Sequence, residues 1–163
     1  MPEWTGWCVG GRWERGGGAG GRGGGGGCDQ PALIYVSTET GQERSYSFRE
    51  LHREVQRTAA TLKDMGVVKG DRVLIYMPMI AEAAFAMLAC ARIGAIHSVV
   101  FGGFASVSLA SRIEDATPKV IISADAGSRG GKVVAYKPLL DEAIRLSSHK
   151  PRAVLLVDRW LAP

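Results

Sequence analysis

The chain has 163 residues, of which 46% are hydrophobic and 22% charged, and its formal net charge is +4. This composition is typical of one globular domain with room for a tail, and it is too apolar for a chain that is disordered throughout. The basic residues are scattered, which does not indicate a nucleic-acid partner, and the longest apolar run, 83–91, is too short to cross a membrane.

Glycine is concentrated at the start of the chain, where thirteen of the 22 glycines fall within residues 1–28. Ordering glycine costs the most backbone entropy, and no helical or strand periodicity offsets that cost here. We therefore predict that residues 1–28 are a disordered tail, either a flexible linker or a non-native start, and that residues 29–163 fold. Cys90 is the single cysteine of the folded part, which indicates neither a disulfide framework nor a metal site and favours a reducing compartment.

The folded part opens with a predicted strand at 32–36 and a returning strand at 44–47 that would form a hairpin. Ser47 and Glu50 have the spacing of a capping box, in which each side chain satisfies a backbone amide at the start of a helix. Apolar residues then recur at steps of three and four up to Met65, which predicts an amphipathic helix that ends at Gly66.

Strands and helices are predicted to alternate over the rest of the chain. The nearly continuous apolar run at 72–77 is typical of a strand buried on both faces, as in a parallel sheet. The predicted order is strand 72–77, helix 81–93, strand 96–100, helix 106–116, strand 119–124, a glycine-rich loop at 125–132, a helix from about Pro138 to Leu146 and strand 153–157. This alternation predicts an α/β fold with a mostly parallel sheet and helices on both faces. Because the chain ends soon after a strand, we expect it to be an incomplete domain.

Two loops are candidate ligand sites, because parallel sheets bind ligands beyond the carboxyl ends of their strands. The first is Phe101-Gly102-Gly103-Phe104, which follows a predicted strand. Its glycines leave the backbone open to a flat or charged ligand, and either phenylalanine could stack on a base. The alternative is a tight strand-to-helix turn with two core phenylalanines.

The second candidate is Ser128-Arg129-Gly130-Gly131-Lys132, in which two cations flank two bare peptide units. Charge-assisted hydrogen bonds and exposed amides suit a phosphate group. The alternative is a solvated basic turn. Neither candidate has the glycine spacing of a Walker loop or a Rossmann fingerprint.

Other polar residues carry weaker signals, and none is assigned a catalytic role. His97 lies in a predicted strand without an acidic or nucleophilic neighbour in the sequence, so we interpret it as a core or sheet histidine. Asp125 follows a strand end, which favours a structural role. Glu114 and Asp115 are adjacent on a helix, so they fall on different sides of it and are expected to be solvated. No metal site is predicted.

Several stretches of this sequence closely resemble acetyl- and propionyl-CoA synthetases, which belong to the adenylate-forming acyl-CoA synthetase superfamily. The resemblance covers about residues 29–160 and is closest to the propionyl-CoA synthetase branch. One departure is Ala81, where the family usually has proline. The stretches that carry the resemblance are 76–80, 87–104, 112–116, 123–133, 136–139 and 149–151.

The resemblance implies that the chain is the N-terminal part of the large domain of an AMP-forming enzyme. In this family a short-chain carboxylate such as propionate or acetate attacks Mg-ATP to give an acyl-adenylate and pyrophosphate, and coenzyme A (CoA) then displaces AMP. The two glycine loops hold the nucleotide end of CoA in the family. The implied CoA-binding residues are Phe101, Gly102, Gly103, Arg129, Gly130, Gly131 and Lys132.

The family's phosphate loop, acyl pocket and C-terminal lysine domain have no counterpart in these 163 residues. We therefore expect the chain to be inactive alone, because nothing in it would stabilise the adenylation transition state. Two alternatives stay open, a non-catalytic module that binds CoA or a nucleotide and a truncated product without an independent fold. The expected partners are small molecules, and the resemblance implies a cytoplasmic protein, or a mitochondrial one in a eukaryote.

Overall fold

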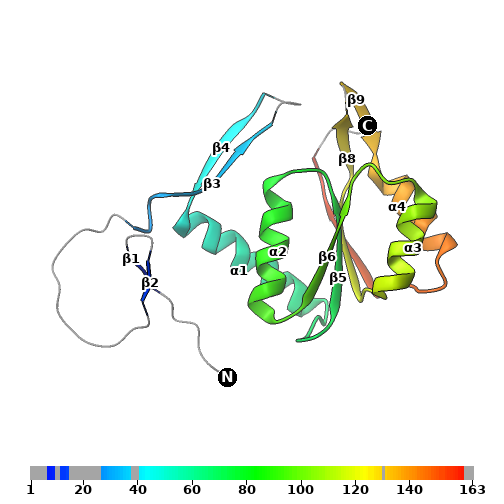
Figure 1. Ribbon diagram of the computed structural model, residues 1–163, viewed down its shortest axis with the longest axis horizontal. Helices are drawn as coiled ribbons and strands as arrows, with labels where there is room; N and C mark the ends of the chain where they lie inside the picture. Colours follow the sequence, from blue (N-terminus) through cyan, green and yellow to red (C-terminus); the bar gives the residue numbers. More distant parts are fainter. Residues whose placement is uncertain (1–6, 10–11, 15–26, 38–40, 130, 160–163) are drawn as a thin grey trace.

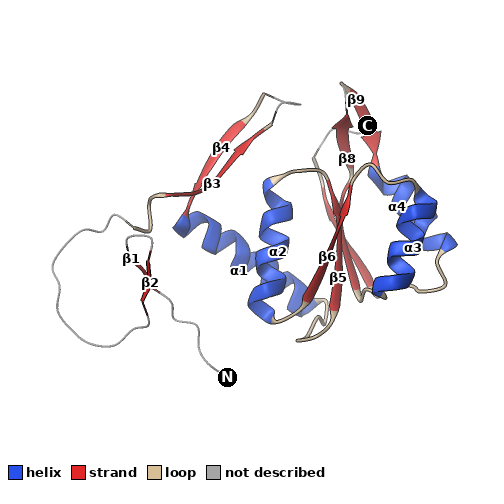
Figure 2. Ribbon diagram, in the orientation of Figure 1, coloured by secondary structure: helices blue, strands red, loops and turns tan. Residues whose placement is uncertain are grey.

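The computed structural model describes residues 7–9, 12–14, 27–37, 41–129 and 131–159. These residues form four helices, a four-stranded parallel sheet and three two-stranded antiparallel pairs (Figures 1 and 2). Two helices lie on each side of the parallel sheet (Figure 1). The predicted α/β fold is therefore confirmed.

The parallel sheet has the strand order β10-β7-β5-β6. Its two inner strands are buried along almost their whole length, which explains why their sequences are continuous apolar runs rather than alternating ones. Tyr76 is the largest fully buried side chain of this core. The strands are β5 (Arg72–Met77), β6 (Ile96–Phe101), β7 (Val120–Ala124) and β10 (Ala153–Val157).

The helices divide between the two faces of the sheet. Helices α1 (Phe48–Asp64) and α2 (Ala81–Ile93) cover one face, and α3 (Ser106–Ala116) and α4 (Tyr136–Leu146) cover the other (Figure 1). Each boundary lies within two residues of its prediction. Gly94 ends α2 with a φ of 72°, the left-handed conformation that glycine adopts without strain.

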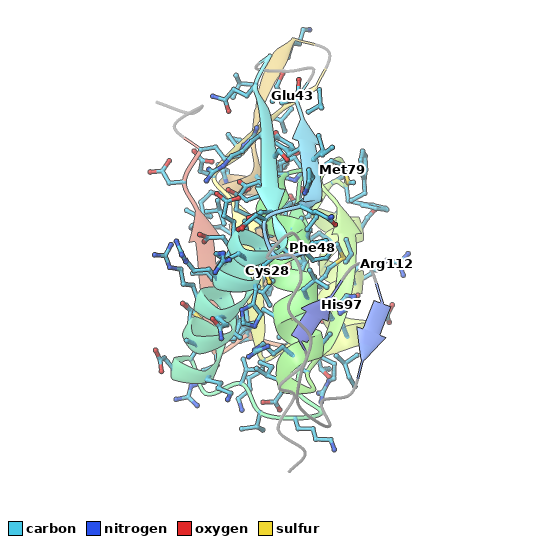
Figure 3. All side chains as sticks on the ribbon, turned by 90° about the vertical axis from the view of Figure 1, so that its left-hand side faces the viewer. Cys28, Glu43, Phe48, Met79, His97 and Arg112 are labelled. Carbon is cyan, nitrogen blue, oxygen red and sulfur yellow. The ribbon has the colours of Figure 1, made fainter. Side chains whose placement is uncertain are left out.

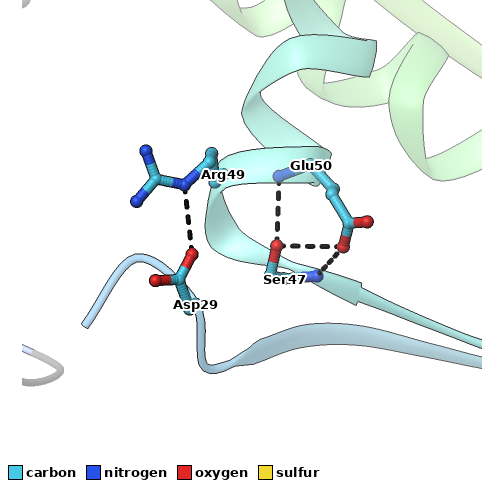
Figure 4. A network of polar contacts seen from close by, with 4 residues as sticks. All are labelled: Asp29, Ser47, Arg49 and Glu50. Atoms are coloured by element: carbon cyan, nitrogen blue, oxygen red, sulfur yellow. Dashed lines mark hydrogen bonds and ion pairs between the residues drawn. The ribbon is translucent and has the colours of Figure 1, made fainter. Parts of the chain in front are cut away.

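The first helix begins with the predicted capping box. Strands β3 (Pro31–Val36) and β4 (Glu43–Ser47) form the predicted antiparallel hairpin, which delivers Ser47 to the start of α1. The Ser47 hydroxyl accepts the Glu50 N–H (3.3 Å), and the Glu50 carboxylate accepts the Ser47 N–H (2.8 Å) (Figure 4). The Ser47 N–H and the Ser47 hydroxyl both donate to the Glu50 carboxylate, and these two bonds hold the pKa of Glu50 below its ordinary value. Arg49 also pairs with Asp29 at 3.1 Å, which ties the chain before β3 to the same helix end.

Most of the predicted tail lies outside the described residues. Of residues 1–26, the structure describes only 7–9 and 12–14. Within this tail, β1 (Trp7–Val9) pairs antiparallel with β2 (Arg12–Glu14). Residues 1–6, 10–11 and 15–26 lie outside the described part, so the disorder of this segment stays a prediction.

The alternation of strands and helices is interrupted after β7, where the predicted glycine-rich loop is wrong. Residues 125–132 contribute to a hairpin of β8 (Ala126–Arg129) and β9 (Lys132–Ala135) that projects beyond the sheet (Figure 1). Gly131 has a φ of 77°, so it supplies the left-handed residue that a tight turn between paired strands needs. A second correction is smaller: β6 extends one residue further than predicted, so Phe101 is its last residue.

Candidate functional site

At the carboxyl edge of the sheet, the connections that leave neighbouring strands go to opposite faces. Strand β5 leads to α2 on one face, whereas its neighbour β7 leads through the β8–β9 hairpin to α4 on the other face. Adjacent strands whose connections separate in this way leave a crevice beyond their carboxyl ends, where α/β proteins bind ligands. Both predicted glycine segments lie at this edge, one after β6 and one after β7.

The segment after β6 is a tight turn that presents one phenylalanine to solvent. The Phe104 N–H donates to the Phe101 carbonyl (3.3 Å), which closes the turn. Phe104 packs against the core, but Phe101 is 60% exposed, so the alternative of two core phenylalanines holds only for Phe104. The buried Tyr76 hydroxyl donates to the Phe104 carbonyl (3.2 Å). Burial raises the pKa of Tyr76 to about 12, which keeps this donor protonated.

The segment after β7 carries its cations at the end of the β8–β9 hairpin. Arg129 and Lys132 are a cross-strand pair that flanks the turn at Gly131, and Lys132 is exposed. Gly130 lies outside the described residues. Apart from Gly131 and its two chain neighbours, no heavy atom of the described residues lies within 4 Å of the position that a Gly131 Cβ would occupy, which leaves this side of the backbone accessible to a ligand.

The Phe101–Phe104 turn and the base of the β8–β9 hairpin meet at Tyr136, the first residue of α4, which is 5% exposed. A Cβ added at Gly102 would lie 2.6 Å from the Tyr136 hydroxyl oxygen, and one added at Gly127 would lie 2.7 Å from the same atom. The Phe101–Phe104 turn and the base of the hairpin therefore lie side by side against one ring. Residue chemistry alone did not single out Tyr136 or Gly127, because their contact joins positions far apart in the sequence.

Asp125 anchors the base of the hairpin, in keeping with the structural role predicted for it. Its carboxylate accepts the N–H groups of Ala126 (2.6 Å) and Arg159 (3.0 Å). Its carbonyl accepts the N–H groups of Tyr136 (2.8 Å) and Lys137 (3.2 Å). One residue thus holds the start of β8, the start of α4 and the chain beyond β10.

The weaker candidates lie elsewhere. His97 is exposed near the start of β6, away from Met79 at the carboxyl end of β5 (Figure 3). Glu114 is exposed as predicted, yet its carboxylate accepts the N–H and the hydroxyl (2.8 Å) of Ser148. These bonds hold the pKa of Glu114 below its ordinary value.

A cavity of about 220 Å³ lies apart from the glycine segments, between β4, α1, α2 and the β7–β10 side of the sheet. Arg44, Glu54 and Glu82 supply its charged lining, and Phe85 and Leu155 contribute apolar surface. None of its lining residues belongs to the predicted CoA-binding set. Sequence reasoning did not predict this cavity, because it is formed by elements that are distant in the chain.

Further properties of the described residues bear on the class of protein. None of their helices is both long and apolar enough to span a bilayer. Among them, no group of three or more His, Cys, Asp or Glu side chains is arranged to hold a metal ion. Cys90 is a free thiol in the core, and burial raises its pKa to about 11.

Comparison with known proteins identifies the family to which this sequence is similar. The model of the family described as AMP-binding enzyme matches residues 24–161. The chain is 66% identical over 131 residues to a propionate–CoA ligase of Escherichia coli (strain K12), and 65% identical over 131 residues to one of Salmonella typhimurium. Each match covers 80% of this chain and 21% of the relative.

A human relative is a mitochondrial protein named acyl-CoA synthetase short-chain family member 3. The chain is 47% identical to it over 131 residues, which are 80% of this chain and 19% of that protein. The chain thus spans about a fifth of the length of the curated relatives it matches. Because the family match extends over most of these 163 residues, the chain belongs to the AMP-binding enzyme family.

Proposed function

We propose that this chain forms the CoA-binding part of an ATP-dependent, AMP-forming short-chain acyl-CoA synthetase. The observation that carries the proposal is that Gly102 in the Phe101–Phe104 turn and Gly127 at the base of the β8–β9 hairpin both lie against the Tyr136 ring. The aromatic turn and the hairpin that carries the cationic residues therefore start side by side at one edge of the sheet. The adenosine 3′-phosphate end of CoA needs both features, a surface for the base and positive charge for the phosphate.

In this proposal the Phe101–Phe104 turn receives the adenine. Phe101 is exposed and can stack on the base, while Gly102 and Gly103 leave peptide groups without side chains beside it. The tip of the hairpin receives the 3′-phosphate through Arg129, Lys132 and the amides around Gly130 and Gly131. Cations and bare amides recognise phosphate through charge-assisted hydrogen bonds.

The rest of the reaction would use ATP, supplied as Mg-ATP, and a short-chain carboxylate. Propionate is favoured over acetate because two bacterial relatives of high identity are named propionate–CoA ligases. We also propose a cytoplasmic protein, supported by the free, buried Cys90, which is typical of a reducing compartment.

Calorimetric titration of the 163-residue chain with CoA and with 3′-dephospho-CoA tests the proposal. We expect CoA to bind at least about tenfold more tightly, since one phosphate held by charge-assisted bonds contributes about 1.5–3 kcal/mol. Lys132→Ala should weaken CoA binding and leave 3′-dephospho-CoA binding unchanged. Lys63→Ala is the matched control, because Lys63 is an exposed lysine at the far end of α1.

Equal affinity for the two ligands, or equal loss with Lys132→Ala and Lys63→Ala, would refute the assignment of the hairpin to the 3′-phosphate. Pyrophosphate release with propionate, acetate or neither acid measures whether the chain has activity of its own. Turnover at rates typical of enzymes would contradict the view that this chain contributes only CoA binding.

A further inference from the structure

Tyr136 lies against the Phe101–Phe104 turn and the base of the β8–β9 hairpin but supplies neither charge nor open backbone to the proposed CoA site. An added Cβ would lie 2.8 Å from the Tyr136 Cζ atom at Gly102 and 2.9 Å from it at Gly127. Real Cβ atoms do not approach other heavy atoms this closely. Two segments from different parts of the chain therefore close upon one phenol ring, and each can do so only without a side chain.

The need for glycine at these two positions comes from space and not from backbone conformation. Among the described residues, the glycines with positive φ are Gly41, Gly66, Gly70, Gly94 and Gly131. Gly102 and Gly127 are not among them, so alanine is allowed by the backbone at both positions. The obstacle to a Cβ is the Tyr136 ring alone among the three nearest atoms at each glycine.

The ring is held on several sides and cannot easily give way. Tyr136 is 5% exposed, and its centroid lies 5.3 Å from the centroid of the buried Tyr76 ring at an interplanar angle of 45°. Its backbone N–H donates to the Asp125 carbonyl (2.8 Å), which fixes the start of α4. Displacing such a ring would disturb a packed core, and overpacked cores lose stability.

We propose that Tyr136 is a positioning residue, whose ring sets the separation between the Phe101–Phe104 turn and the β8–β9 hairpin. A ligand that spans both segments then meets its two contacts at one fixed distance. This inference rests on the proposed CoA function, in which the adenine and the 3′-phosphate are those two contacts. Tyr136 itself touches neither group in this arrangement.

The first test compares Tyr136→Leu with Tyr136→Phe by calorimetry, using CoA and 3′-dephospho-CoA as ligands. The measured quantity is the dissociation constant of 3′-dephospho-CoA divided by that of CoA. This ratio reports how much the phosphate contact adds to the adenine contact. We expect Tyr136→Leu to lower this ratio toward one, by about tenfold, because an adenine and a phosphate contact at variable separation no longer reinforce each other. Tyr136→Phe keeps the ring and should keep the ratio.

This ratio separates positioning from mere stability. A variant that is partly unfolded loses affinity for both ligands by the same factor, which leaves the ratio unchanged. A ratio that stays at the wild-type value in Tyr136→Leu, while the wild-type chain prefers CoA, overturns the inference and leaves the proposed function intact.

The second test is a mutant cycle that needs no ligand. Gly102→Ala and Gly127→Ala should each lower the thermal midpoint, and the double variant should lose less than the sum, because one displacement of the ring accommodates both methyl groups. In the Tyr136→Leu background both alanines should be nearly neutral. Additive losses, or equal losses in the two backgrounds, overturn the inference.

The two tests also distinguish the inference from the function on which it rests. If the wild-type chain binds neither ligand, the proposed function fails, and the thermal cycle still decides whether Tyr136 joins the two segments. If Gly102→Ala does not fold, recovery of a cooperative melt on adding Tyr136→Leu supports the inference, and failure to recover contradicts it.

Discussion

Asp125→Ala should destabilise the chain by about 2 kcal/mol. In the structure, the Asp125 carboxylate accepts two backbone N–H groups, from Ala126 at 2.6 Å and from Arg159 at 3.0 Å. A protein hydrogen bond contributes about 1 kcal/mol net, and losing this acceptor deprives two amides of their partner. Both bonds are partly buried, so water can solvate the released amides in part, which keeps the loss near the sum of two ordinary bonds.

Urea unfolding followed by circular dichroism measures this loss as a shift of the midpoint at unchanged slope. The same loss should lower the thermal midpoint by roughly 4–8 °C in a domain of this size. Asp125→Asn keeps an oxygen acceptor but no charge, so about half of the effect is expected, because charge-assisted bonds are roughly twice as strong as neutral ones.

Asp115→Ala is the control, since Asp115 is exposed on α3, and its effect should stay within about 0.5 kcal/mol. The reasoning is refuted if Asp125→Ala is no more damaging than this control, or if Asp125→Asn is as damaging as Asp125→Ala. Either result would mean that the carboxylate does not anchor the hairpin through these two amides.

Three further outcomes are expected. Ser47→Ala should cost about 1 kcal/mol in urea unfolding and Ser47→Thr much less, because threonine also caps a helix; equal losses would contradict the capping role. Cys90 should resist iodoacetamide near pH 8 until the chain is unfolded, as mapped by mass spectrometry, because its raised pKa leaves about one thiolate in a thousand thiols; rapid native labelling would contradict its burial. The folded pKa of Glu114 is depressed, so its carboxylate stabilises the fold above the unfolded pKa, and this contribution is lost as pH falls through the folded pKa. The difference in thermal midpoint between wild type and Glu114→Gln should therefore close on acidification, and a pH-independent difference would contradict this account.

The elements that could be predicted from sequence are those governed by local rules. The capping box at Ser47 and Glu50 involves residues three positions apart, and the structure has both of its hydrogen bonds. The run at 72–77 is apolar because β5 is buried on both faces, so its composition alone indicates a central strand. Each of these signals depends on residues that are close together in the chain, so it can be recognised in a single sequence.

The β8–β9 hairpin shows where local rules were incomplete. Its Gly130-Gly131 pair between short runs is itself a hairpin signal, but glycine is equally common in loops. What stabilises the pairing is tertiary: Gly127 fits against Tyr136, and Asp125 joins both ends of the hairpin to the sheet. Neither contact has a sequence pattern of its own, so sequence reasoning predicts a loop at residues 125–132.

The candidate site divides in the same way. The positions of the two glycine segments follow from the strand order, because both come after parallel strands and so reach the same edge. Their contact through Tyr136 does not follow, since it depends on where α4 begins relative to the end of β6.

The way the β8–β9 hairpin is attached has a consequence for how its outer part can change. The Asp125 carboxylate binds the amide that opens the hairpin, and the Asp125 carbonyl binds the amide that follows β9. The chain therefore leaves the body of the domain and returns to it beside Asp125, and the base of the hairpin is held again where Gly127 lies against the Tyr136 ring. These anchors lie at the base of the hairpin, whereas Arg129 and Lys132 pair at its other end, beside the turn. A longer, shorter or differently charged tip would therefore change which ligands the hairpin can bind while leaving the anchors at its base in place.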